Sequence, residues 1–138
     1  MTSTEKLELR VQSEVNPTED PEKVKVAIFR LFGEIPLDII DGTRGKAVFG
    51  RTQKAEALSK FQDLLRRERI LDAARKVLSR GCQGKSIHFY LNKQVAYVGH
   101  VSFSEPVGES PLGPIYVEII CNDAQKMIDW LVPKTFNR

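Results

Sequence analysis

The amino-acid sequence predicts an α+β domain with helices packed on one face of a mostly antiparallel sheet. Segments with period-two hydrophobicity, typical of half-buried strands, are interspersed with segments of period 3.6, typical of amphipathic helices. The expected element order is β-α-β-β-α-α-β-β-β-α, which is typical of helices layered on a sheet. A length of 138 residues and a hydrophobic content of 41% suit a single domain spanning residues 1–138.

The first strand is expected over residues 6–15, KLELRVQSEV, where leucine and valine alternate with polar residues. The first helix follows within NPTEDPEKVKVAIFRLFG. Asp20 is a suitable N-cap, and Pro21 suits the first helical position. Apolar side chains then recur at helical spacing until Gly33, where the helix should end.

The central segment predicts two short strands followed by two helices. The strands lie within LDIIDGTRGKAVF, residues 37–49, and are joined by an Asp-Gly pair that is common in tight turns. Helical periodicity then extends from Thr52, as the N-cap, to Gly81, as the stop. Because about 28 residues is long for one helix of a small domain, we expect a break near residues 66–69.

The last third of the sequence predicts three strands and a helix. SIHFYL and QVAYVGHVSF are expected to form a hairpin around Asn92 and Lys93. After the Pro- and Gly-rich loop EPVGESPLGP, the segment IYVEIIC should form the last strand. Asn122 or Asp123 then caps a closing helix, DAQKMIDWLV, which Pro133 ends.

Cysteine usage and hydropathy restrict the location of the protein. Cys82 and Cys121 form neither a C-x-x-C pair nor a disulfide framework, so both are expected to be reduced thiols. The segment MTSTEKLELR lacks a basic stretch followed by an apolar one, and no run reaches the roughly 18 apolar residues that span a bilayer. We therefore expect a cytoplasmic protein without a membrane partner.

Charge is distributed unevenly along the chain. The formal net charge of +3 combines −4 for residues 1–42, +9 for residues 43–100 and −2 for residues 101–138. A middle third this basic suits a polyanionic partner such as RNA. Dense surface charge also occurs in thermophile-type proteins for reasons unrelated to ligands.

Residues 79–86, SRGCQGKS, are similar to a phosphate loop of the form G-x-x-x-x-G-K-S, with Ser79 in place of the first glycine. A phosphate loop follows a strand and starts a helix, so that the positive end of the helix dipole faces the phosphates. Here the expected order is reversed, and we predict no nucleotide cofactor. This segment and GTRG, residues 42–45, are instead interpreted as basic loops. The cations that could touch phosphates from these loops are Arg44, Lys46, Arg80 and Lys85.

The sequence predicts neither a metal site nor a catalytic centre. The only sulfur and imidazole ligands lack the close pairing that metal sites use; they are Cys82, His88, His100 and Cys121. Cys82 and Ser86 are the available nucleophiles, but the sequence assigns neither of them an activating base. A hydrolase would require a base folded beside one of them, so we expect a protein that is not an enzyme.

The most informative segment is the basic second half of the long helical region. Residues 64–85 hold seven basic residues against two acidic ones. On a continuous helix, the spacing would place four of them on one face, from which they could follow a phosphate backbone; these are Arg66, Arg69, Lys76 and Arg80. The alternative interpretation is a solvated helix face balanced by Glu68 and Asp72.

The predicted hairpin offers a second surface. If its turn has two residues, His88, Tyr90, Val95 and Tyr97 share one face of the sheet. Rings on an open sheet face can stack on bases. A dimer interface is an equally good interpretation of the same face.

The segments IHFYLNKQVAYVGHVSF, ESPLGPIYVEI and VNPTEDPEKVKVAI resemble those of a small archaeal family of largely uncharacterised proteins. The similarity extends from the first strand to the closing DWLVPKT, and the L-N-K-Q and L-G-P-I stretches are fairly specific. The resemblance implies an α+β fold like that of the ribosomal large-subunit protein that contacts 5S ribosomal RNA. It also implies a predicted RNA-binding or exosome-associated protein, and it carries no catalytic residues over.

We therefore expect a non-catalytic protein that holds structured RNA by phosphate contacts, with weak sequence preference. The alternative is a structural protein that forms a homodimer, or docks into an RNA-processing assembly, through its sheet.

Overall fold

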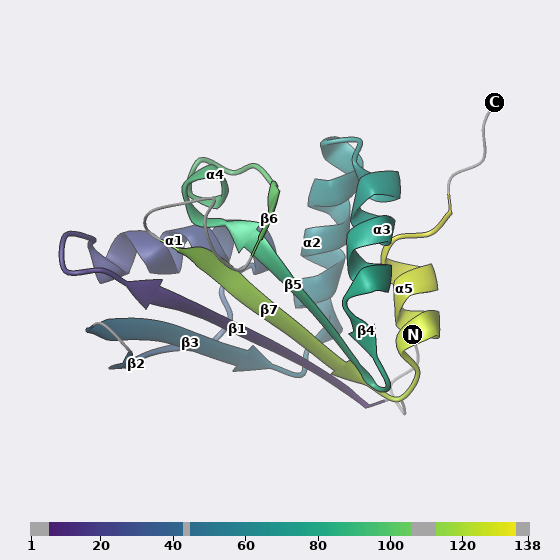
Figure 1. Ribbon diagram of the computed structural model, residues 1–138, viewed down its shortest axis with the longest axis horizontal. Coiled ribbons are helices and arrows are strands. Elements are labelled where there is room, and N and C mark those ends of the chain that lie inside the picture. Colours follow the sequence, from purple (N-terminus) through teal and green to yellow (C-terminus); the bar gives the residue numbers. More distant parts are fainter. Residues whose placement is uncertain (1–5, 43–44, 106–112, 135–138) are drawn as a thin grey trace.

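The computed structural model describes residues 6–42, 45–105 and 113–134 (Figure 1). Within these ranges the elements follow in the order β1 (Leu7–Val15), α1 (Pro21–Phe32), β2 (Leu37–Asp41), β3 (Lys46–Thr52), α2 (Ala55–Arg67), α3 (Leu71–Arg80), β4 (Cys82–Gln83), β5 (Ser86–Asn92), α4 (Lys93–Tyr97), β6 (Phe103–Ser104), β7 (Pro114–Cys121) and α5 (Ala124–Leu131). The predicted α+β class is confirmed, and the predicted order holds in outline.

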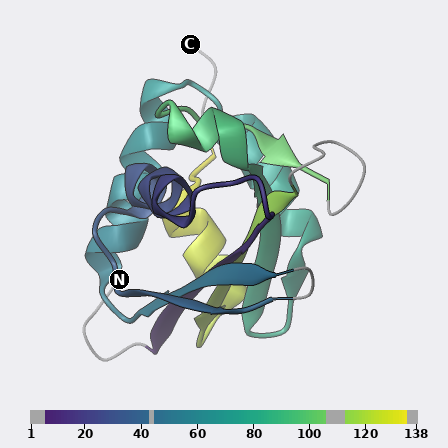
Figure 2. The same ribbon diagram turned by 90° about the vertical axis from the view of Figure 1, so that its left-hand side faces the viewer.

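The described strands form one antiparallel sheet in the order β2-β3-β1-β7-β5-β4, with β6 added on β5. The helices lie together on one side of it (Figures 1 and 2). Alternation explains this arrangement, because every second residue of β1, β5 and β7 is buried. The register aligns the buried positions in rows across the sheet, such as Val11 opposite Val117 and Val117 opposite Phe89.

The core lies between that face and the helices. Phe32 of α1, Phe61 of α2 and Phe89 of β5 stack in sequence, with ring centroids 5.1 and 5.8 Å apart. The opposite side of the sheet, which we call the open face, carries the alternate side chains of β1, β5 and β7. These side chains are only partly buried.

The first helix forms as its sequence signals predict. The Asp20 carboxylate accepts a hydrogen bond from the Glu22 N–H, and Pro21 occupies the first turn. Gly33 ends the helix with a φ of 83°, a backbone conformation that favours glycine. The predicted cap of the last helix is also confirmed, because the Asp123 carboxylate accepts from the Lys126 N–H.

The predicted break in the long helical segment is confirmed. It separates α2 from α3 at residues 68–70, where Arg69 adopts a φ of 60°. Thr52, however, is not the N-cap of α2. It ends β3, and its hydroxyl accepts a hydrogen bond from the Lys54 N–H at 3.2 Å in the turn before the helix.

The hairpin predicted for residues 86–103 is largely wrong. Its second half begins as the helix α4, and only Phe103–Ser104 pairs with β5. Asn92 starts α4 by accepting a hydrogen bond from the Val95 N–H. Lys93, which was expected in the turn of this hairpin, instead begins α4 and is buried with 4% exposure.

The segment similar to a phosphate loop leaves a helix and enters a strand, as the sequence predicts, but it also contains the short strand β4, which was not predicted. Residue 80 ends α3, β4 pairs with β5, and Gly84 makes the turn with a φ of 61°. No helix follows it to direct a dipole at a phosphate. Across the described ranges, no helix has both the length and the apolar composition needed to cross a bilayer.

Candidate nucleic-acid interface

Four of the predicted RNA-binding cations lie between the end of α2 and the end of α3. Arg66 is in the last turn of α2, Arg69 is in the turn between the helices, and Lys76 and Arg80 are on α3; all four are exposed. None of them forms an ion pair with another residue in the described part of the chain. Glu68, the carboxylate nearest in sequence to the first two, is instead hydrogen-bonded to His100 at 2.9 Å.

The break between α2 and α3 changes how these cations are arranged. Because the helix is not continuous, they do not form one straight row. Arg66 and Arg69 lie at the turn, whereas Lys76 and Arg80 follow along α3, a ten-residue helix about 15 Å long. Lys76 and Arg80 line an open depression of about 560 Å³ on α3, together with Asp72, Arg75 and Ser79.

Arg75 has a structural role instead. Its guanidinium donates to the Asp129 carboxylate at 2.7 Å and to the Val132 carbonyl at 3.0 Å, which fastens α5 to α3. The hydrogen bond from Arg75 lowers the pKa of Asp129. Charge counting included Arg75 among the basic residues of this segment, but it could not reveal the ion pair with Asp129, 54 positions away in the sequence.

The loop cations are divided between the two edges of the sheet. Lys46 begins β3 near the β2 edge and forms an ion pair with Asp41 at 3.3 Å. Lys85 is exposed in the turn between β4 and β5, at the edge that follows α3. Arg44 lies outside the described residues. The structure therefore places Lys85 at the β4 edge of the sheet, which follows α3 in the chain, and Lys46 near the opposite edge, formed by β2.

The open face brings together His88, Tyr90 and a residue that the sequence analysis missed, Tyr116. The ring centroids of His88 and Tyr116 are 5.9 Å apart, and those of Tyr90 and Tyr116 are 5.3 Å apart. Tyr97 is not on this face, because it belongs to α4, where it is 38% exposed. Alternation in IYVEIIC was the available signal for Tyr116, but it becomes useful only when the pairing of β7 with β5 is known.

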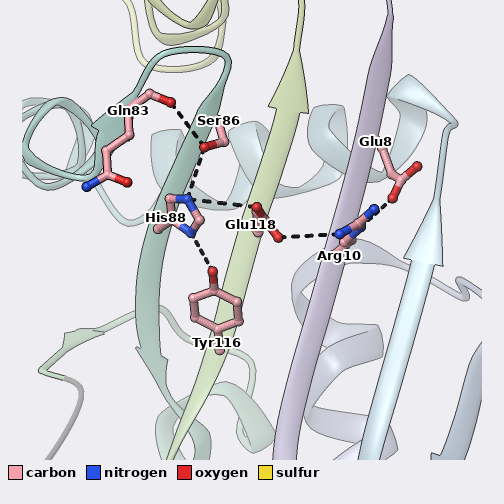
Figure 3. A network of polar contacts seen from close by, with 7 residues as sticks. All are labelled: Glu8, Arg10, Gln83, Ser86, His88, Tyr116 and Glu118. Atoms are coloured by element: carbon pink, nitrogen blue, oxygen red, sulfur yellow. Dashed lines mark hydrogen bonds and ion pairs between the residues drawn. The ribbon is translucent and has the colours of Figure 1, made fainter.

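A chain of polar contacts crosses the open face (Figure 3). The Ser86 hydroxyl lies 3.1 Å from the Gln83 carbonyl and 3.0 Å from His88 Nε2. The other ring nitrogen of His88 contacts the Tyr116 hydroxyl. Glu118 lies 3.8 Å from both His88 Nε2 and Arg10.

Proton counting assigns a direction to this chain. The serine hydroxyl has one proton, which the carbonyl of Gln83 accepts, so His88 Nε2 carries the proton that points at Ser86. Nδ1 then accepts from the Tyr116 hydroxyl. Burial, and after it the Glu118 carboxylate, raise the pKa of Tyr116, which keeps this phenol protonated and able to donate.

This direction bears on the hydrolase alternative. Folding does bring an imidazole within 3.0 Å of Ser86, as that alternative requires. The imidazole donates to the serine as long as the Ser86 hydroxyl donates to the Gln83 carbonyl; a hydroxyl rotated toward Nε2 would meet the other tautomer and reverse this direction. No cluster of three or more metal-ligating side chains occurs within the described ranges.

The remaining polar contact on this face is an ion pair. Arg10 contacts Glu8, and the hydrogen bond from Arg10 lowers the pKa of Glu8, while the same contact raises the pKa of Arg10. Because Arg10 also faces Glu118, the charges in the centre of the open face are balanced locally. The exposed cations of α3, Lys76 and Arg80, form no ion pair within the described residues, although Asp72 lines the same depression.

Comparison with known proteins gives consistent matches over most of the chain. Residues 8–120 match a family model described as RNA binding. A UPF0201 protein of Metallosphaera sedula is 42% identical over 125 residues, which cover 91% of this chain and 87% of the relative. A UPF0201 protein of Sulfurisphaera tokodaii is 46% identical over 125 residues, covering 91% and 86%.

A solved structure supports the fold. The crystal structure of a UPF0201 protein from Methanococcus jannaschii superimposes with a TM-score of 0.84 at 37% sequence identity, covering 94% of this chain and 96% of that one. The expected likeness to the ribosomal protein that contacts 5S ribosomal RNA is not addressed by these matches and stays a prediction.

Proposed function

Because the chain belongs to the archaeal UPF0201 family and matches the RNA-binding family model, we propose that it holds structured RNA through phosphate contacts and without catalysis. The observation that carries this proposal is a set of exposed cations that form no ion pair among the described residues, at the end of α2, in the turn after it and on α3: Arg66, Arg69, Lys76 and Arg80. Lys85 extends the contact from the turn between β4 and β5, whereas Lys46 is paired with Asp41 near the opposite edge of the sheet and would contribute less. The partner is RNA with weak sequence preference, because phosphates carry no sequence information.

The physical basis is counterion release. RNA carries condensed cations along its phosphates, and a protein cation that replaces them gains the entropy of their release. A side chain already paired with a carboxylate contributes little, because its own pair must first be broken. This favours Lys76 and Arg80 as contacts over Arg75, whose guanidinium is bonded to α5.

The test is the salt dependence of binding to a labelled, structured RNA between about 50 and 200 mM salt. The variant Lys76→Gln/Arg80→Gln should bind more weakly and should lose roughly one unit of slope in log K against log salt for each phosphate contact removed. The matched control is Lys126→Gln, which removes an exposed cation from α5. Salt-insensitive binding, or an identical slope for the two variants, would contradict the proposal.

Association through the sheet is the second candidate function, and one observation favours it. Ile40 on the edge strand β2 is 40% exposed, and its pairing with Ala47, itself opposite Glu14, places it on the open face. An exposed edge with an apolar side chain can pair with another chain. Light scattering of the wild type and of Ile40→Lys tests this. A wild type that is monomeric at micromolar concentration removes the homodimer.

A further inference from the structure

The open face is hollowed where β1, β7 and β5 run side by side. This hollow has a volume of about 460 Å³ and is lined by Gln12, Ser13, Glu14, Tyr90, Pro114 and Tyr116. Its size lies within the range of small-molecule sites. The described helices pack against the other face, so none of them covers it (Figures 1 and 2).

Two phenol rings form the aromatic part of the hollow. Tyr90 and Tyr116 are opposite each other in the β5–β7 register, with ring centroids 5.3 Å apart and planes inclined by 49°. Tyr116 is held by its hydrogen bond to His88, whose other nitrogen is fixed by Ser86 (Figure 3). The Tyr116 ring is therefore fixed before any ligand binds, and the Tyr90 ring packs beside it at an angle. An exposed aromatic ring on a sheet is a common surface for stacking an unpaired base.

The other wall of the hollow is polar. Gln12 is opposite Tyr116 in the β1–β7 register, and Glu14 lies two residues further along β1 on the same face. Glu14 also lines the hollow, while its Oε1 atom is buried beside Gly42 at the end of β2, on the side of β1 away from Tyr116. A carboxylate accepts hydrogen bonds and donates none, so it suits the exocyclic amino group of adenine, cytosine or guanine and opposes the carbonyl oxygens of uracil.

The charge near the hollow disfavours a phosphate as the occupant. Arg10 lies between Glu8 and Glu118, and Glu14 adds a further negative charge at the hollow, whereas Arg51, the other cation of this face, is opposite Arg10 on β3 and does not line the hollow. An anion would be repelled here, whereas the flat, neutral ring of a base would not.

We propose that this hollow binds one unpaired nucleobase that carries an exocyclic amino group, stacked against Tyr90 and Tyr116 and read by Gln12 and Glu14. The inference rests on the proposed function, since it adds a base contact to the phosphate contacts on α3. The two sets of residues belong to different elements and can be changed independently.

The principal experiment measures the affinity of labelled single-stranded octamers of A, C and U by fluorescence anisotropy. Tyr90→Leu keeps an apolar side chain at a half-buried position but removes the ring. It should weaken binding of the A and C octamers by roughly 5- to 150-fold, the range for one base–aromatic stack, and leave the salt slope unchanged. Tyr97→Leu is the matched control, because it makes the same change on α4. The wild type should bind the A and C octamers more tightly than U, and Glu14→Gln should reduce that difference.

A second measurement requires no substitution. Adenosine and uridine, which carry no phosphate, are titrated with the wild-type protein, and their base protons are followed by NMR. The adenine protons should shift upfield, as stacking on rings requires, and the uracil protons should shift less. Equal or absent shifts would overturn the inference.

The outcomes separate the two proposals. If Tyr90→Leu and Tyr97→Leu bind the octamers alike, or if U binds as well as A, the hollow is not a base site, while the salt slope of Lys76→Gln/Arg80→Gln still tests the phosphate contacts. If the slope is unaffected by that variant but Tyr90→Leu weakens binding, the proposed function fails and the base site stands. If Tyr90→Leu instead dissociates a dimer seen by light scattering, the occupant is a second copy of the chain and the inference is wrong.

Discussion

Replacing Lys93 with methionine should lower the free energy of unfolding by about 2–4 kcal/mol, because two buried acceptors would lose the ammonium group that they share. The ammonium of Lys93 donates to the Glu14 carbonyl at 2.7 Å and to the Glu19 carboxylate at 2.9 and 3.2 Å. The lysine side chain is 4% exposed, and that of Glu19 is 12% exposed. These contacts join α4 to the end of β1 and to the loop before α1.

The magnitude follows from what the substitution leaves behind. Methionine fills most of the volume of the lysine stem, so the apolar packing changes little. Removing one partner of a buried ion pair costs about 3–5 kcal/mol, since the other charge stays buried. Glu19 keeps hydrogen bonds from the backbone N–H and the side-chain amide of Asn16, both at 3.0 Å, which reduces this cost.

The assay is unfolding in guanidinium chloride, followed by the fluorescence of Trp130, the single tryptophan of the chain. A loss of this size should lower the midpoint by about 0.5–1 M. The control is Lys126→Met, which makes the same change at an exposed position of α5 and should leave the midpoint almost unaltered. A Lys93→Met midpoint equal to that of the control would refute the reasoning.

The pH dependence checks the same contact independently. Burial alone would raise the pKa of Glu19, but the hydrogen bonds from Asn16 and Lys93 outweigh it and hold the pKa below the ordinary value of 4.5. A carboxyl with a lowered folded-state pKa stabilises the protein above its unfolded pKa, and the contribution is lost as the pH falls through the folded pKa. The difference between wild type and Lys93→Met should therefore be largest near pH 7 and should shrink below about pH 4. A difference that grows on acidification would contradict this account.

Three further predictions test the helix ends, the contact between α3 and α5, and the open face. Gly81→Ala should destabilise the protein by more than about 2 kcal/mol, because the new Cβ would lie 1.9 Å from a backbone carbonyl oxygen of β5. Gly84→Ala should cost only about 1–2 kcal/mol, because its Cβ meets nothing within 4 Å and only the positive φ opposes it. The midpoints of unfolding in guanidinium chloride compare the two variants. Arg75→Ala should speed amide hydrogen exchange in α5, while Lys76→Ala should not, because only the first side chain bonds that helix. Ser86 should resist labelling by a fluorophosphonate probe, since its proton is held by a carbonyl; stoichiometric labelling, abolished by Ser86→Ala, would restore the hydrolase alternative.

The parts of the fold that local sequence determines could be predicted. Alternation identified β1, β5 and β7, because each strand buries one face against the helices whatever its neighbours are. Capping identified both ends of α1, since the Asp20 and Gly33 signals act within a few residues. The turn between α2 and α3 was predicted only from the length of the helical segment, which is too long for one helix of a small domain.

The wrong predictions fall where contacts between residues far apart in the sequence determine the local structure. QVAYV has the β-branched and aromatic composition of a strand, yet Lys93–Tyr97 is helical. The Asn92 cap favours that outcome locally, but the burial of Lys93 depends on Glu19, 74 positions away in the sequence. A pattern of single residues contains no information about such a partner, so tertiary contacts override the local preference.

The candidate site shows the same division. Counting charges found the basic segment, but only coordinates distinguish Arg75, which is bonded to α5, from Lys76 beside it. Strand parity found His88 and Tyr90, whereas Tyr116 and Gln12 join them only through the register of β7 with β5 and β1. The hollow is therefore a property of strand order, which no single strand reveals.

The proposed phosphate and base contacts differ in the force that drives them, and this explains why one fold can carry both. Attraction of RNA from a distance requires exposed cations that are not held in ion pairs, which the described surface offers along α3, whereas Arg10 in the centre of the open face is matched by Glu8 and Glu118. Discrimination between bases requires rings and hydrogen-bonding groups held close together, and a sheet positions them more rigidly than an exposed helix does. Salt screens the first contribution strongly and the second weakly. The salt dependence of affinity should thus report on α3, and the preference for one base over another should report on the strands.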